Sequence, residues 1–147
     1  MTWLEILVAK LASRVDRQLD GLNDKHAFSV AHDAYLSGDL KAALAGYEAL
    51  AKRKHGRAAA LAGEMHLSGK GTKVNGAKAL KYFALGKDAD DPDAIALLGM
   101  AHAAGMAGIK IDYFKARPYL ETAVKNGDAK AKRMLDHVKA QQKGRRQ

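Results

Sequence analysis

The chain has no cysteine, only two prolines and few aromatic side chains, which make up 6% of its 147 residues. The lack of cysteine excludes disulfides, thiolate metal sites and cysteine nucleophiles. Because proline is scarce while alanine and leucine are abundant, the composition favours an all-α protein. Long hydrophobic runs are also missing. Glu5 and Lys10 interrupt the apolar N-terminus, so we expect neither a signal peptide nor a membrane span there, and a cytoplasmic location.

Acidic residues are outnumbered by basic ones, 16 to 25, which gives a formal net charge of +9. Most of this excess lies at the C-terminus. The candidate basic patch consists of Lys130, Lys132, Arg133, Lys139, Lys143, Arg145 and Arg146. Such a segment can bind nucleic acid, an anionic membrane or an acidic protein, and charge alone does not distinguish them. A solvated terminal helix that keeps the protein soluble is the simpler interpretation.

The same pattern of residues occurs twice, with a spacing of 36 or 37 positions, and begins a third time. A fixed period in this range is typical of stacked helical repeats. Gly63 and Gly99 fall inside the predicted helices, where glycine is costly, so we expect close helix contacts there. The paired positions are Ala58 and Ala94, Gly63 and Gly99, His66 and His102, Gly69 and Gly105, and Lys78-Ala79 and Lys115-Ala116.

Length and pattern predict one domain, made of helix pairs between two cap helices. Aspartate or asparagine marks the expected helix starts at Asp39, Asn75, Asp91 and Asp112, and Pro92 follows Asp91 at the first helical position. The predicted segments are an N-terminal cap helix (1–22) that ends in a turn at 21–25, repeat 1 (26–56), repeat 2 (57–90), repeat 3 (91–127), a C-terminal cap helix (128–142) and a basic tail (143–147).

These residues resemble the Sel1-like repeat, a relative of the tetratricopeptide repeat with a longer loop. Its pattern is matched at Leu98-Gly99, Gly105, Asp112, Lys115-Ala116 and Ala123, and in the preceding copy at Ala58, Gly63, Gly69, Gly71, Lys78-Ala79 and Tyr82-Phe83. The resemblance implies an all-α, right-handed superhelix (solenoid) whose first helices line a concave groove for a partner peptide or protein. His66 and His102 replace a tyrosine of the family. Thr72 replaces a valine, one residue is inserted between Gly105 and Gly108, and Gly86-Lys87 replaces a double alanine. From these departures together we expect less regular packing in repeat 2.

The candidate partner-binding residues lie on the predicted first helices, at or beside the repeated histidine. They are His32, Tyr35, Glu64, His66 and His102. Two histidines could also ligate a metal ion. Without a carboxylate or thiolate at a fixed spacing this is a weak signal, and histidine that replaces tyrosine in the groove wall is preferred.

No catalytic motif is found in the sequence. Asp88, Asp90, Asp91 and Asp93 lack the turn glycine and distal glutamate of a calcium loop, so a helix start is preferred. Gly69-Lys70-Gly71-Thr72 has the wrong spacing for a phosphate loop. We therefore expect no enzyme, catalytic residue, cofactor or metal.

The expected function is that of an adaptor, scaffold or regulator that binds a protein or peptide in the groove. The alternative is electrostatic binding of nucleic acid or an anionic membrane through the basic C-terminal segment. A monomer is favoured, and a homodimer formed through the apolar N-terminal face remains open.

Overall fold

The computed structural model describes residues 1–145, apart from the side chains of residues 16 and 20. Within residues 1–145 there are helices and no strands. The helices are α1 (Trp3–Ser37), α2 (Leu40–Lys52), α3 (Gly56–Ser68), α4 (Gly76–Asp88), α5 (Pro92–Ala104), the short 3-10 helix η1 (Met106–Gly108), α6 (Tyr113–Lys125) and α7 (Ala129–Gly144).

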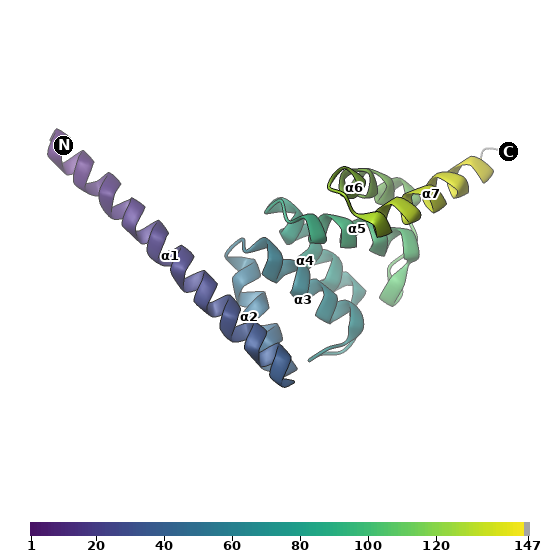
Figure 1. Ribbon diagram of the computed structural model, residues 1–147, viewed down its shortest axis with the longest axis horizontal. Coiled ribbons are helices and arrows are strands. Elements are labelled where there is room, and N and C mark those ends of the chain that lie inside the picture. The colour runs from purple at the N-terminus through teal and green to yellow at the C-terminus, as the bar shows by residue number, and fades with distance from the viewer. Residues whose placement is uncertain (146–147) are drawn as a thin grey trace.

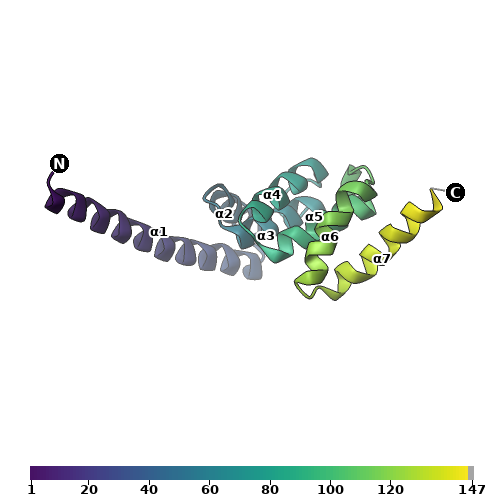
Figure 2. The ribbon, with the colours of Figure 1, turned by 90° about the horizontal axis from the view of Figure 1, so that it is seen from above.

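The helices form antiparallel pairs that stack in chain order, and Figure 1 shows these pairs in a row. The end of α1 packs against α2, α3 packs against α4, α5 packs against α6, and α7 follows without a second helix. The view from above in Figure 2 shows the same succession. The protein is therefore an all-α helical-repeat solenoid, as the sequence predicts.

Side-chain caps begin the helices at the predicted residues. Asp39, Asn75, Asp91 and Asp112 each accept a hydrogen bond from a backbone N–H in the first turn of α2, α4, α5 and α6. Such a cap satisfies one of the donors that a helix start leaves unpaired. The first helices α3 and α5 end at left-handed glycines, Gly69 and Gly105. In both repeats the following loop then folds back on its helix. The backbone N–H of Asn75 donates to the His66 carbonyl (2.8 Å), and the backbone N–H of Asp112 donates to the His102 carbonyl (2.9 Å).

The close helix contacts expected at the two mid-helix glycines are confirmed. A Cβ atom at Gly63 would lie 2.4 Å from Cε1 of Phe83, and one at Gly99 would lie 2.9 Å from Cγ of Leu120. Gly86 also allows a close approach, here between repeats. A Cβ atom there would lie 2.4 Å from the Cβ of Ala94, so this glycine lets repeat 3 approach repeat 2 closely.

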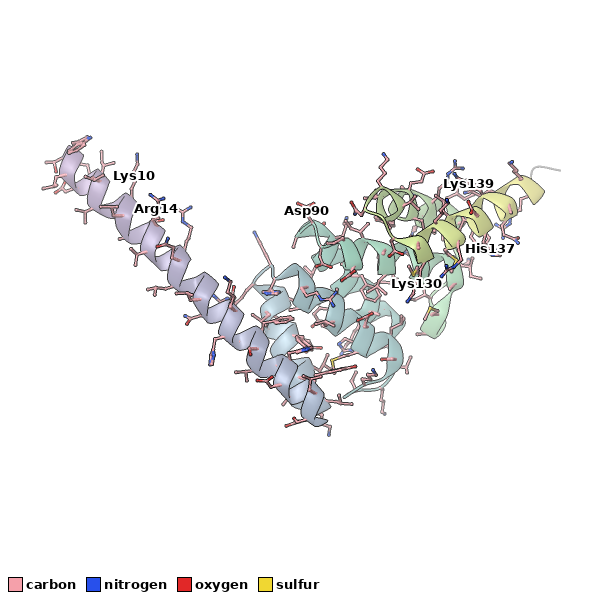
Figure 3. The ribbon with its side chains drawn as sticks, in the orientation of Figure 1. Lys10, Arg14, Asp90, Lys130, His137 and Lys139 are labelled. Atoms are coloured by element: carbon pink, nitrogen blue, oxygen red, sulfur yellow. The ribbon has the colours of Figure 1, made fainter. Side chains whose placement is uncertain are left out.

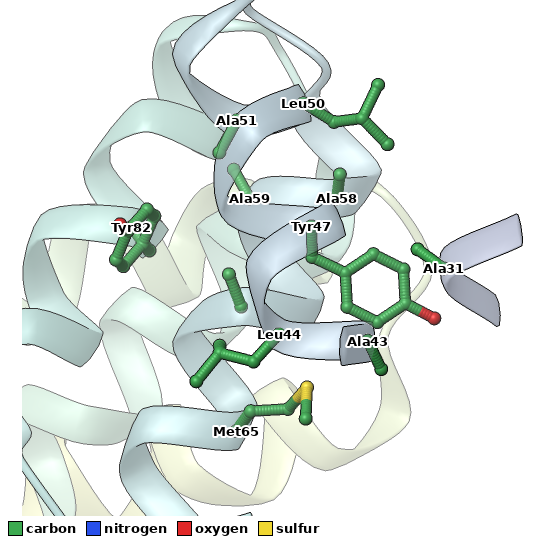
Figure 4. Packing of buried hydrophobic residues seen from close by; sticks show 11 residues of the cluster. Ala31, Ala43, Leu44, Tyr47, Leu50, Ala51, Ala58, Ala59, Met65 and Tyr82 are labelled. Carbon is green, nitrogen blue, oxygen red and sulfur yellow. The ribbon is translucent and has the colours of Figure 1, made fainter. Parts of the chain in front are cut away.

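Each second helix places a fully buried large side chain at the equivalent position of its repeat. Tyr47 of α2, Phe83 of α4 and Leu120 of α6 are each at most 1% exposed, and they follow one another at 36 and 37 residues. Much of the remaining core is alanine, which allows the helices to approach closely. Figure 4 shows the first of three core clusters, in which Tyr47 and Met65 lie among alanines of α1, α2 and α3.

The prediction of an N-terminal helix that ends in a turn at 21–25 is wrong. Helix α1 runs without a break to Ser37. A single glycine costs a helix only about 1 kcal/mol, and no proline stops α1 here. In addition, Asp24 forms an ion pair with Arg53 (3.0 Å), just after α2, and the rest of α1 packs against α2 through residues such as Phe28 and Ala31. The expected capping role is wrong too, because the first half of α1 extends away from the repeats (Figure 1) and residues 1–15 are exposed.

Candidate protein-binding groove

The first helices of the repeats share one side of the solenoid, and this side is hollowed. A pocket of about 540 Å³ lies between α1, α3 and α5. Helix α3 contributes side chains at intervals of three and four residues, which is the spacing of one helix face. Its lining includes Tyr35, Leu61, Glu64, Ser68, Lys70, Leu97 and Met106.

A second pocket, of about 650 Å³, lies further along the same side between α5 and α7. Both pockets use one face of α5, because Leu97 lines the first while Met100 and Ala104 line the second, three and seven residues later. We call the two pockets together the first-helix groove. In the second pocket α7 contributes Lys130, Arg133, Met134 and His137. Figure 3 labels Lys130 and His137 on this helix.

The groove has an apolar floor and a charge that differs along its length. Leu61, Leu97, Met100 and Met134 are half-buried and supply apolar surface. At the α7 end, Lys130 and Arg133 are exposed cations on the rim. At the opposite end, Lys70 donates a hydrogen bond to the Tyr35 hydroxyl (2.7 Å), and its Nζ lies 5.3 Å from the centre of that ring. The groove can therefore accept apolar side chains along its floor and carboxylates beside α7.

Of the predicted partner-binding residues, the structure places two in the groove. Tyr35 and Glu64 both line the first pocket. His32 is exposed on α1, where Nδ1 lies 3.1 Å from the hydroxyl of Tyr47 and the ring stacks on Phe28.

The placement of His66 in the groove is wrong. Its side chain is 2% exposed, Nε2 donates to Oε1 of Glu48 (2.6 Å), and its ring stacks on Tyr82. The reason lies in helix geometry. In an α-helix, the directions of side chains two residues apart differ by about 200°, so His66 and Glu64 point to nearly opposite sides of α3. His66 is therefore part of the packing between α3, α2 and α4, and its side chain is out of reach of a partner.

His102 has the same position in the next repeat and is half-buried. Its ring stacks on Tyr119, and it lines a separate pocket of about 420 Å³ with Asp112 and Lys115. Burial, together with the positive charge of Lys115, lowers the pKa of His102 below its ordinary value of 6.5, and Asp112 partly opposes this. The structure thus brings neither repeat histidine into the groove.

Helix α7 divides the predicted basic patch between two faces. Lys130 and Arg133 line the groove. Lys132, Lys139 and Lys143 are spaced by seven and four residues, so they share another face, about 130° away from the first pair. The guanidinium carbon of Arg145 lies 5.5 Å from the centre of the Tyr113 ring, and Arg146 lies outside the described residues.

Within the described part of the chain, no group of three or more histidine, aspartate or glutamate side chains could hold a metal ion. No helix among these residues is both long and apolar enough to cross a bilayer.

Sequence reasoning missed most of the groove floor. Leu61, Leu97 and Met100 have no unusual chemistry and read as ordinary core residues. A signal was nevertheless present, because Leu61 and Leu97 are 36 residues apart, and each lies three positions before a second lining residue, Glu64 or Met100. The partner of His66 had no such signal, since Glu48 lies 18 positions away in another repeat.

Comparison with known proteins gives matches only at the level of structure. No family model matches the sequence, and no curated protein matches it. A Sel1 repeat protein from Oxalobacter formigenes superposes with a TM-score of 0.67 and 26% identity. A protective antigen of uropathogenic Escherichia coli with an SLR fold superposes with a TM-score of 0.68 and 21% identity. The matches cover 76% and 79% of this chain, but the chain spans only 47% and 26% of those proteins.

The stacked helix pairs with a long loop inside each later pair define the class as a helical-repeat solenoid. The structural matches agree with the repeated residues, and the chain has the fold of Sel1-like repeat proteins.

Proposed function

We propose that the protein is a non-enzymatic adaptor or scaffold, and that it holds a segment of a partner protein in the first-helix groove. The observation that carries the proposal is the groove itself, in which adjacent pockets of about 540 and 650 Å³ share one face of α5. An extended apolar floor with charged groups at its rim is suited to a peptide or a helix, because apolar anchors supply affinity and rim charges set orientation. Helical repeats commonly use such extended surfaces for binding.

The charges of the groove indicate what the bound segment contains. Lys130 and Arg133 lie beside the half-buried Met134 and Met100. Methionine adapts its shape to different apolar side chains. The preferred ligand is therefore an amphipathic segment with apolar anchors and one or more carboxylates near α7.

Selection from a random peptide library tests this function. The immobilised chain is used to select peptides, and their affinity for the chain is then measured by fluorescence polarisation. We expect Glu64→Lys and Met106→Lys, both at exposed groove positions, to weaken binding of the selected peptides by about tenfold.

The matched control is Phe114→Lys. Phe114 is 74% exposed and lies in a different pocket, beside Arg117 and Pro118 of α6. This variant should bind the selected peptides as the unchanged protein does. Selected peptides that lose affinity equally with all three variants, or with Phe114→Lys alone, would show that the groove is not the binding surface.

A second candidate function is supported by Lys132, Lys139 and Lys143, which form an exposed basic stripe outside the groove. Such a stripe suits electrostatic binding of nucleic acid or an anionic membrane. This function requires affinity that falls steeply with salt, and the groove floor plays no part in it.

A further inference from the structure

The first half of α1 has a broad apolar stripe that nothing in the described chain covers. Trp3 is 76% exposed, and Leu4, Val8 and Leu11 are each more than half exposed. Isolated helices of this length are only marginally stable in water, and helices gain most of their stability when an apolar face is packed. The stripe therefore belongs to an interface.

The spacing within the stripe is that of a coiled coil. From Leu4 through Val8 and Leu11 to Val15, the apolar residues alternate at intervals of four and three. The next seam position is the polar Gln18, with the exposed Leu19 beside it, and the seam ends at Leu22. In heptad terms, Val8 and Val15 occupy a positions, while Leu4 and Leu11 occupy d positions. A β-branched residue at a combined with leucine at d favours two parallel strands.

The seam ends where packing within the chain begins. Leu22 is 62% exposed, and Asp24, two residues later, is the first half-buried residue of α1. Beyond this point α1 packs against α2 through residues such as Phe28 and Ala31. Helix α1 thus has two successive interfaces. Its second half packs against its own chain, and its first half has no partner within the described chain.

The charges beside the stripe indicate the orientation of a self-pair. Lys10, Arg14 and Arg17 lie along one flank of the helix, at intervals of four and three. The other flank carries Glu5 and no basic residue. When two copies pair in parallel, unlike flanks meet, whereas an antiparallel pair brings like flanks together.

We infer that α1 forms a parallel, two-stranded coiled coil with α1 of a second copy of this chain, through residues 4–22. The alternative of an anionic membrane lacks its main driving force, since three basic and three acidic residues cancel between residues 1 and 22. The first half of α1 extends away from the repeats (Figure 1), so the seam is accessible to a second chain. The dimer presents two grooves, which strengthens binding to a partner with two segments.

Sedimentation equilibrium of the full chain over a range of concentrations tests this inference. We expect a monomer–dimer equilibrium, and we expect Leu11→Glu to raise the dimer dissociation constant about tenfold or more, because it places a carboxylate in the apolar seam. Ser13→Glu introduces the same side chain away from the seam and should leave the constant unchanged. Circular dichroism checks that both variants keep their helix content.

Disulfide formation tests the orientation, because the chain has no cysteine of its own. In a parallel pair, Val8 lies opposite Val8 of the second copy, so Val8→Cys should oxidise to a covalent dimer while Ser13→Cys does not. An antiparallel pair that overlaps fully along residues 4–22 places Val8 opposite Gln18, so crosslinking of Val8→Cys only to Gln18→Cys would show that orientation. That result would overturn the inference, as would a monomer at every concentration or a dimer that tolerates Leu11→Glu. A monomer that binds phosphatidylserine vesicles through α1 would overturn it as well.

Discussion

Helices α3 and α4 approach each other at Gly63, where a methyl group would lie within 2.5 Å of two ring atoms of Phe83. We predict that Gly63→Ala lowers the free energy of unfolding by about 1–3 kcal/mol, the usual cost of overpacking, although alanine alone favours a helix. Gly21→Ala is the matched control. It lies inside α1 with nothing within 4 Å of the added Cβ, so its effect should be neutral or slightly stabilising. Urea unfolding measures both, and equal effects would contradict this account.

His66 differs from its neighbour Glu64 in burial, although both lie on α3. Replacing His66 by alanine removes the hydrogen bond to Glu48 and the stacking on Tyr82. We expect His66→Ala to lower the free energy of unfolding by about 2 kcal/mol. Glu64→Ala, on the exposed side of the same helix, should change it by less than about 0.5 kcal/mol. Thermal and urea unfolding of the two variants decide whether His66 stabilises the array.

His102 makes stability depend on pH. Because its pKa in the folded protein lies below the ordinary value of 6.5, the unfolded chain binds its proton more readily than the folded chain. The contribution of His102 to stability is therefore complete above pH 6.5 and is lost as the pH falls from there through the lowered pKa. We expect the unfolding free energy of His102→Gln to fall less between pH 7.5 and 5.5 than that of the unchanged protein. Equal slopes for the two proteins would contradict this account.

At the scale of elements, the sequence was sufficient for most helix boundaries because caps and breakers are local. Asn75 and Asp112 begin α4 and α6 as predicted, and a left-handed glycine, Gly69 or Gly105, ends α3 or α5. The turn predicted at 21–25 failed for a non-local reason. Whether a glycine-containing stretch stays helical depends on what it packs against, and here α2 and the residue after it hold α1 straight.

This arrangement predicts that the first half of α1 is dispensable for the fold of the repeats. Residues 1–15 are exposed, and they add no side chain to any of the three core clusters. We expect deletion of residues 1–15 to leave the urea midpoint of the repeats unchanged at concentrations too low for self-association. Deletion of 1–31, which removes the buried Ala31, should lower it clearly. A large loss with the shorter deletion would show that the first half of α1 covers the repeats after all.

At the scale of the whole molecule, the sequence predicted that helices stack but gave little of the groove. The period of 36 or 37 residues specifies the stacking, because each repeated position meets its counterpart. The lining of the groove depends on which helix face remains uncovered after stacking. Tyr35 and Glu64 were identified by their place on a first helix, whereas His66 was misplaced because its direction around the helix was not considered.

The division of the α7 charges separates the two candidate functions. Lys130→Glu with Arg133→Glu changes the groove, and Lys132→Glu with Lys139→Glu changes the other face by the same net charge. If a partner segment lies in the groove, the first pair of substitutions should weaken peptide binding about tenfold or more, while the second pair has little effect. Binding to nucleic acid or an anionic surface would respond to both pairs and fall steeply with salt. Titrations of selected peptides and of an oligonucleotide at two salt concentrations distinguish these outcomes. Peptide binding that is lost equally with either pair would show that long-range charge, and not the groove, controls recognition.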